Sequence, residues 1–177
     1  MSLLALVLVA AAHPGAAVGT VQVARGVAEP SVYLIRKSDG ESLRLVGDPT
    51  RELRNLQSAT VEVLGNESAG RMFVEGYRIV EVQGGGRPTA VGTVVVVGSG
   101  GLGLGTDGGA PVPLSAGPKL RSALGALVGG KLWVIGEKLL SGEVKVLRYG
   151  ILREPPPPPA KAEPAKEKLT PTTPPKP

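Results

Sequence analysis

Cysteine is absent from the 177-residue chain, and the single histidine, His13, lies close to the N-terminus. Without thiolates, and with one imidazole at most, the chain lacks the side chains that ordinarily bind structural or catalytic zinc. It also lacks a cysteine nucleophile and, apart from His13, the imidazole base of a Ser-His triad. We therefore expect no metal site, no cofactor and no catalytic residue, and we interpret the chain as a non-enzymatic protein.

Aromatic residues are scarce as well, at 3% of the chain, although hydrophobic residues make up 42%. A core must therefore be built from valine, leucine, isoleucine and alanine. Since β-branched side chains pack well on pleated sheets, this composition favours small barrels or sheets over large ligand pockets.

The N-terminal sequence MSLLALVLVAAAHPGAAVG resembles a secretory leader. Residues 3–12 form an apolar run of signal-peptide length, and Pro14 and small residues follow it. The run is shorter than the roughly 20 residues that a membrane-spanning helix needs. We expect a signal peptide at residues 1–17, cleavage near Ala17, and a periplasmic or secreted protein without a transmembrane span. The alternative is a buried first strand or helix, because no lysine or arginine precedes the run.

Two parts of the chain resemble one another at a spacing of about 70 residues. VGTVQVARG, from Val18, matches VGTVVVVGSG, from Val91, and Asp39-Gly40 matches Asp107-Gly108. Later matches in the same order are Pro49 with Pro118, Leu53 with Leu124, Leu56 with Leu127, Val63 with Val134, Gly65 with Gly136, Tyr77 with Tyr149 and Ile79 with Ile151. We interpret the pattern as a duplicated domain.

Each copy has the same order of expected elements. A strand opens it, and a hairpin follows with an Asp-Gly turn, which tolerates the positive φ of tight hairpins. A short helix comes next, with Asp48 as cap and Pro49 at its first position in copy one, and Ser115 or Gly117 before Pro118 in copy two. The expected strands are 19–23, 60–64 and 73–82 in copy one, and 92–97, 131–135 and 143–152 in copy two.

Three strands, a helix and two further strands is an order that resembles the OB-fold, a five-stranded Greek-key barrel. The resemblance implies a mainly β protein of two tandem five-stranded OB-like barrels, each with one short helix. The expected organisation is a signal peptide at 1–17, an OB-like domain at 18–83, a linker at 84–90, a second OB-like domain at 91–153 and a disordered Pro/Lys-rich tail at 154–177.

Gly98, Gly100 and Gly103 fit the spacing G-x-G-x-x-G of dinucleotide-binding loops. That motif requires a helix after its third glycine and an acidic residue about 20 positions later. Here LGTDGGAPVP follows, and residues 108–136 contain no aspartate or glutamate. We predict a glycine-rich hairpin and no nucleotide site.

Charge differs between the copies. Residues 18–83 carry 8 basic and 9 acidic side chains, whereas residues 90–153 carry 7 and 3. Copy two is therefore the expected face for an anionic partner, although the basic residues could equally form an ordinary solvated surface. The candidate residues in copy two are Lys119, Arg121, Lys131, Lys138, Lys145 and Arg148.

An alternative function is single-stranded nucleic-acid binding, in which Tyr33, Arg36 and Lys37 would continue the basic groove of copy two. We do not expect nucleic acid as the partner, because copy one offers only Tyr33 for stacking on its second and third strands. The remaining aromatic residues are expected to pack in the core: Phe73, Tyr77, Trp133 and Tyr149. A third alternative, an enzyme that uses Asp48 or Glu52, has only the proximity of these carboxylates to support it.

The C-terminal sequence EPPPPPAKAEPAKEKLTPTTPPKP is too rich in proline for a helix or a sheet. We expect an extended spacer, and a second docking element at Pro155, Pro156, Pro157, Pro158 and Pro159. Altogether the sequence predicts an exported interaction or scaffold module of a bacterial envelope, with an envelope protein or an anionic polymer as its partner. It does not indicate the oligomeric state.

Overall fold

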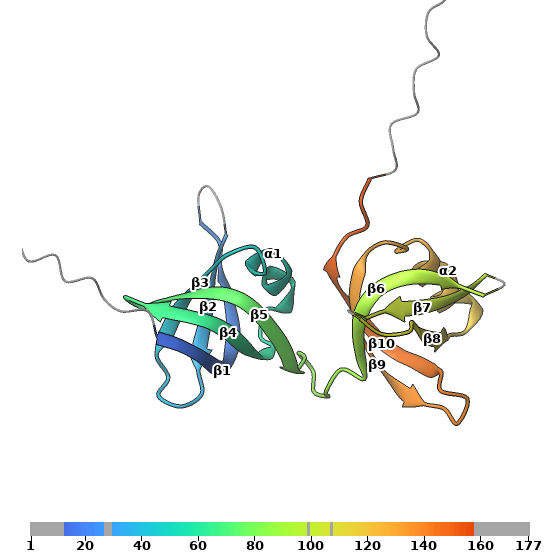
Figure 1. Cartoon of the computed structure of the whole chain (residues 1–177), viewed down its shortest axis with the longest axis horizontal. Helices are drawn as coiled ribbons and strands as arrows, with labels where there is room; N and C mark the ends of the chain where they lie inside the picture. The colour runs from blue at the N-terminus through green and yellow to red at the C-terminus, as the bar shows by residue number, and fades with distance from the viewer. Residues whose placement is uncertain (1–12, 27–29, 99, 107, 158–177) are drawn as a thin grey trace, which may run out of the picture.

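The computed structural model describes residues 13–26, 30–98, 100–106 and 108–157 (Figure 1). This part of the chain is mainly β, with two five-stranded sheets and two short α-helices. The predicted mainly β fold is confirmed. Most of the predicted leader and of the proline-rich tail lie outside the described residues.

The first sheet closes on itself in the strand order β1-β2-β3-β5-β4. All neighbours are antiparallel except β3 and β5, which are parallel. The helix α1 and a 3₁₀ turn lie between β3 and β4 in the chain. The bounds are β1 His13–Ala24, β2 Ser31–Arg36, β3 Ser42–Val46, α1 Thr50–Leu53, η1 Arg54–Leu56, β4 Thr60–Ser68 and β5 Arg71–Glu81.

The second sheet has the corresponding closed order, β10-β8-β7-β6-β9. Its parallel pair is β8 with β10, and α2 precedes β9 as α1 precedes β4. The bounds are β6 Ala90–Val97, β7 Gly101–Gly105, β8 Val112–Ser115, α2 Pro118–Gly125, β9 Lys131–Lys138 and β10 Val144–Arg153. We refer to the two closed sheets as barrel 1 and barrel 2.

Equivalent hydrogen bonds join the first strand of each barrel to the segment before its fourth strand. In barrel 1 the Val21 amide donates to Ala59 O at 2.9 Å, and the Ser58 amide donates back to Val21 O at 2.9 Å. In barrel 2 the Val94 amide donates to Gly130 O at 2.8 Å, and the Gly129 amide donates back to Val94 O at 2.9 Å. Ser58 and Gly129 both have positive φ, 63° and 88°.

Glycines recur at equivalent places of close backbone approach. A Cβ on Gly19 would lie 2.3 Å from Ile35 O, and one on Gly92 would lie 2.4 Å from Gly105 O. Later in each barrel, a Cβ on Gly65 or on Gly136 would collide in the same way with a carbonyl of the neighbouring strand. The glycines that the two sequence copies share therefore mark one backbone geometry that occurs twice.

The glycine-rich segment forms a hairpin, as predicted. β6 pairs with β7 antiparallel, and Val97 lies opposite Gly101. Leu102 and Leu104 point into barrel 2 and are buried, whereas Gly103 and Gly105 alternate with them. β7 is therefore an ordinary strand of this hairpin, and the alternation of leucine with glycine gives the strand one apolar face.

Of the two predicted helix starts, that of α2 is confirmed and that of α1 is not. Gly117 caps α2 and Pro118 occupies the first turn, as expected. In copy one, however, the cap position belongs to Pro49, and no side chain caps the helix. The prediction that Asp48 caps it is wrong. At the start of this helix the Thr50 amide and hydroxyl both donate to the backbone oxygen of Gly47, and not to the Asp48 side chain.

Barrel 1 extends further toward the N-terminus than the predicted domain. Residues 13–17, which the sequence analysis placed in the leader, belong to β1 and pair with Glu67 to Val63 of β4. Ala17 is buried in the core. Within the described residues, no helix combines the length and apolar character needed to span a membrane.

The two barrels share part of their cores. Trp133 of β9 and Leu152 of β10 belong to the buried cluster of barrel 1, and Val91 and Ile135 pack against it. The remaining core of barrel 2 is a separate cluster that includes Leu104, Leu124, Leu132 and Val134. In Figure 1, β9 and β10 of barrel 2 face barrel 1. The barrels therefore pack against one another through apolar side chains, in addition to being joined by the linker.

Candidate functional site

A row of outward-facing residues crosses barrel 1 from β1 to β5. Gln22 is paired with Tyr33, Tyr33 with Arg44, and Arg44 with Arg71. The row results from the two-residue period of each strand, because residues that flank its members point inward and are buried. These flanking residues are Val21, Val32, Leu34, Leu43, Leu45 and Met72.

Phe73 adds an exposed aromatic ring to this surface. It follows Arg71 by two residues on β5 and therefore points to the same side. Its side chain is 47% exposed. The expectation that Phe73 packs in the core is wrong, because β5 turns Met72 and Val74 inward and Phe73 outward. We call Gln22, Tyr33, Arg44, Arg71 and Phe73 the arginine face.

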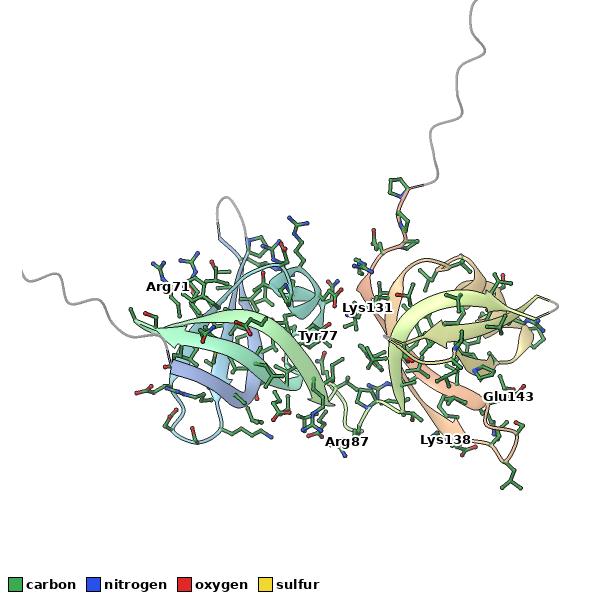
Figure 2. All side chains as sticks on the ribbon, viewed as in Figure 1. Arg71, Tyr77, Arg87, Lys131, Lys138 and Glu143 are labelled. Carbon is green, nitrogen blue, oxygen red and sulfur yellow. The ribbon has the colours of Figure 1, made fainter. Side chains whose placement is uncertain are left out.

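Arg44 and Arg71 are exposed neighbours with the same charge. In the described part of the chain neither side chain makes an ion pair or a hydrogen bond with a protein group. Like charges directly opposite one another on a sheet are destabilising. Figure 2 shows Arg71 pointing away from the barrel. An anionic group placed against the pair would relieve this repulsion and accept hydrogen bonds from two guanidinium groups.

Arg36, the cation that the sequence placed beside Tyr33, is already neutralised. Its guanidinium pairs with Asp39 at 3.3 Å, with Glu41 and with Glu67 at 3.0 Å. Desolvation works against the charged form, but the hydrogen bond that Arg36 donates to Glu41 and the charges of the three carboxylates outweigh it and raise the pKa of Arg36. Arg36 therefore closes the β2–β3 turn, while Lys37 beside it is exposed.

Four of the six candidate cations of copy two have partners within the protein. Arg121 Nη2 donates to Gly100 O at 3.1 Å, and Lys145 pairs with Glu137 at 3.2 Å. Arg148 Nη2 donates to Gln83 O at 2.6 Å, and its guanidinium carbon lies 5.7 Å from the centre of the Trp133 ring. The fourth, Lys131, belongs to the junction between the barrels. Lys119 and Lys138 are exposed and have no such partner among the described residues.

The junction between the barrels holds a compact polar cluster around Glu52. Lys131 Nζ lies 2.6 Å from Glu52 Oε2, and the Tyr77 hydroxyl donates to the same oxygen at 2.7 Å. Lys131 Nζ also lies 5.6 Å from the centre of the Tyr77 ring. Figure 2 shows Tyr77 and Lys131 on facing sides of the junction. A second link runs from Asn55 Nδ2 to Leu152 O at 2.9 Å.

Burial and charge act in opposite directions on Glu52. Desolvation favours its neutral form, but the hydrogen bonds from Lys131 and Tyr77 dominate and hold the pKa of Glu52 below its ordinary value. Desolvation and the hydrogen bond to Glu52 raise the pKa of Tyr77. A carboxylate with a lowered pKa and committed partners is a poor general base, since an effective base has a pKa near the working pH. Glu52 is a structural anchor that joins α1 to β9.

A cleft of about 530 Å³ lies beside this cluster. Asp48, Arg51, Glu75 and Arg153 line it together with the cluster residues. Its charges are mixed, and among them Arg153 Nη1 lies 3.8 Å from Glu52 Oε1. Within the described ranges, no group of three or more histidine, aspartate or glutamate side chains could hold a metal ion.

Barrel 2 lacks the arginine face at the equivalent position. The corresponding row runs from Val95 to Gly103 and Pro113. It contains no cation and no aromatic ring, although the strand order is the same. The duplicated architecture therefore carries the candidate site on barrel 1 alone.

The start of the proline run rests on barrel 2. Pro155 is half-buried, and a Cβ on Gly130 would lie 3.2 Å from its Cδ. Pro156 approaches Gly129 in the same way, at 3.3 Å. Pro157 is exposed. The predicted docking residues Pro158 and Pro159 lie outside the described residues.

Of the arginine face, the sequence indicated Tyr33 alone as a candidate; Gln22, Arg44 and Arg71 were not predicted, and Phe73 was expected in the core. The signal for the last three is the alternation in SLRLV and RMFVE, which places the arginines and the phenylalanine opposite the buried side chains. The pairing of β3 with β5 could not be read from either segment alone. Comparison of the chain with models of protein families, with curated proteins and with solved structures returns no match.

Proposed function

We propose that both barrels are OB-folds and that the protein is a non-enzymatic interaction module that binds an acidic partner through the arginine face. The OB assignment rests on strand order and helix position. Each closed sheet has the order 1-2-3-5-4 in its own numbering, a parallel pair between the third and fifth strands, and a helix between the third and fourth. OB-folds bind polymers on the face of their second and third strands, where Tyr33 and Arg44 lie.

The observation that carries the binding proposal is the adjacent pair Arg44 and Arg71. Two unneutralised guanidinium groups on neighbouring strands cost stability, and the surrounding carboxylates are used elsewhere, as Glu67 is by Arg36. Arginine also presents a fork of donors that suits carboxylate, sulfate and phosphate groups. Barrel 2 contributes Trp133 and Leu152 to the core beneath barrel 1's sheet.

We propose further that the protein is exported and acts in a bacterial envelope. The leader-like sequence of residues 1–12 supports export, with alanines at positions 10–12 that suit a cleavage site. Because residues 13–17 pair with β4, cleavage after Ala12 would preserve the whole of β1, whereas cleavage after Ala17 would remove five of its residues. The proline-rich tail would then serve as a spacer or a second docking element.

A second candidate function is single-stranded nucleic-acid binding, which Tyr33 and Phe73 favour. Two partly exposed rings flank the arginine pair, and bases stack on such rings above a cationic surface. This function requires Arg44 and Arg71 in place of the neutralised Arg36.

The test is equilibrium binding of the full chain to three immobilised acidic probes: heparin, poly-L-glutamate and the oligonucleotide (dT)20. We expect at least one probe to be retained, and the double variant R44Q/R71Q to lose about tenfold or more in affinity. The matched control is K119Q/K138Q, which removes two exposed cations from barrel 2 and should bind within about twofold of the unaltered chain.

Equal losses in both double variants would show nonspecific attraction to a basic protein and would refute a site on barrel 1. Retention of (dT)20 alone, with a steep dependence on salt, would favour the second candidate.

A further inference from the structure

We propose that the arginine face is a subsite for an acidic oligosaccharide, with a sugar carboxylate held between Arg44 and Arg71. This inference rests on the proposed function and specifies its ligand. It depends on the order of groups along the row, on the small number of free cations, and on the Glu75 carboxylate beside Phe73.

The row presents three kinds of chemistry in sequence. Gln22 offers an exposed amide that makes no hydrogen bond with another described residue, Tyr33 offers a partly exposed ring, and the two arginines follow. Neighbouring strands lie about 4.8 Å apart, so the row spans roughly 14 Å. An amide suits the hydroxyl groups of a sugar, a ring suits its apolar face, and an arginine pair suits its carboxylate.

The arginine face carries too few positive charges to bind a polynucleotide. It provides two free guanidinium groups, whereas a nucleic-acid strand brings a phosphate with every nucleotide. Along β5 the next outward residue after Phe73 is the exposed Glu75. A polyphosphate that continued along β5 beyond Phe73 would meet this carboxylate. A sugar chain whose charged and neutral groups are spaced apart would not.

The experiment is calorimetric titration of the full chain with an acidic tetramer in which glucuronic acid alternates with N-acetylglucosamine, with the neutral tetramer of N-acetylglucosamine and with (dT)8. We expect the acidic tetramer to bind at least about tenfold more tightly than the neutral one, because hydrogen bonds to charged groups are stronger than neutral ones. R44Q and R71Q should each weaken binding by about tenfold, and Q22A and Y33A by a smaller factor. K119Q/K138Q should leave the affinity unchanged.

Thermal unfolding of each variant provides the folding control. Five of the six substituted residues are exposed, namely Gln22, Arg44, Arg71, Lys119 and Lys138, and the sixth, Tyr33, is partly exposed. Equal affinity for the acidic and neutral tetramers would overturn the inference. So would failure of the acidic tetramer to bind while (dT)8 or poly-L-glutamate binds in an arginine-dependent way, and in that case the proposed function would stand. If no acidic probe binds in a way that depends on Arg44 and Arg71, both proposals fail.

Discussion

Trp133 lies directly opposite Gly150 across the β9–β10 pair, and its indole occupies the space of the missing side chain. A Cβ on Gly150 would lie 2.4 Å from two carbons of the ring. Because Trp133 also belongs to the core of barrel 1, the absence of a side chain at position 150 allows the ring to reach across the junction. A single glycine in barrel 2 therefore affects the packing of both barrels.

Replacement of Gly150 by alanine should lower the free energy of unfolding by about 1–3 kcal/mol, since overpacking forces the ring or the strand to move. Denaturant unfolding followed by tryptophan fluorescence measures this directly, as the chain has one tryptophan. The matched control is Gly76→Ala on β5, where a Cβ would meet no atom within 4 Å. A loss of equal size at both positions would contradict the role of the indole.

Glu52 should make the protein less stable in acid. Its folded pKa is below the ordinary value of 4.5, so the unfolded chain takes up the proton at a higher pH than the folded chain does. The contribution of Glu52 is therefore complete above pH 4.5 and is lost as the pH falls through the lower, folded pKa. The difference in unfolding free energy between the unaltered chain and E52Q should shrink as the pH falls below 4.5. A difference that is constant between pH 7 and pH 3 would refute this.

Two neighbours test the same cluster. Tyr77→Phe removes one donor to Glu52, and K131M removes the other. Each should cost about 1–3 kcal/mol at pH 7, and the two losses should be non-additive because both act on one carboxylate. A double-mutant cycle measured by denaturant unfolding gives the coupling. Strictly additive losses would mean that the contacts contribute independently.

The start of the folded region can be tested by truncation. A chain that begins at His13 should be as stable as the full chain, whereas one that begins at Val18 should lose about 2 kcal/mol or more, because the pairing of residues 13–17 with β4 is removed. Thermal unfolding compares the two. The mature N-terminus of protein recovered from an exporting bacterial host should be His13. Sequencing that yields Val18 would refute the proposed cleavage site.

The proline-rich tail should add little to the stability of the barrels. A chain that ends at Pro157 should unfold within about 0.5 kcal/mol of the full chain, because the remaining sequence is too rich in proline for a helix or a sheet. A chain that ends at Arg153 loses the contact of Pro155 with Gly130 and should be less stable than one that ends at Pro157. Equal stability of these two truncated chains would show that the prolines add nothing to barrel 2.

The sequence by itself determined the β class, the duplication and the order of the elements. Strand alternation, the shared glycines and the Asp-Gly turn all act over short distances, so they can be read from neighbouring residues. The glycine-rich segment could be predicted as a hairpin, because no helix can begin at LGTDGG, no acidic residue occurs in 108–136, and the segment matches a strand and turn of the other copy.

Only the tertiary structure decided which side chains share a surface. Arg44 and Arg71 are distant in the chain, and it is the parallel pairing of β3 with β5 that makes them neighbours. Phe73 was assigned to the core from its strand alone, yet its exposure depends on which face of β5 the closed sheet turns inward. Lys131 and Arg148 were read as a binding surface, but the packing of the barrels gives them Glu52 and the Gln83 carbonyl as partners. Local propensity sets the strands, whereas barrel closure and the contact between barrels determine which charges remain free.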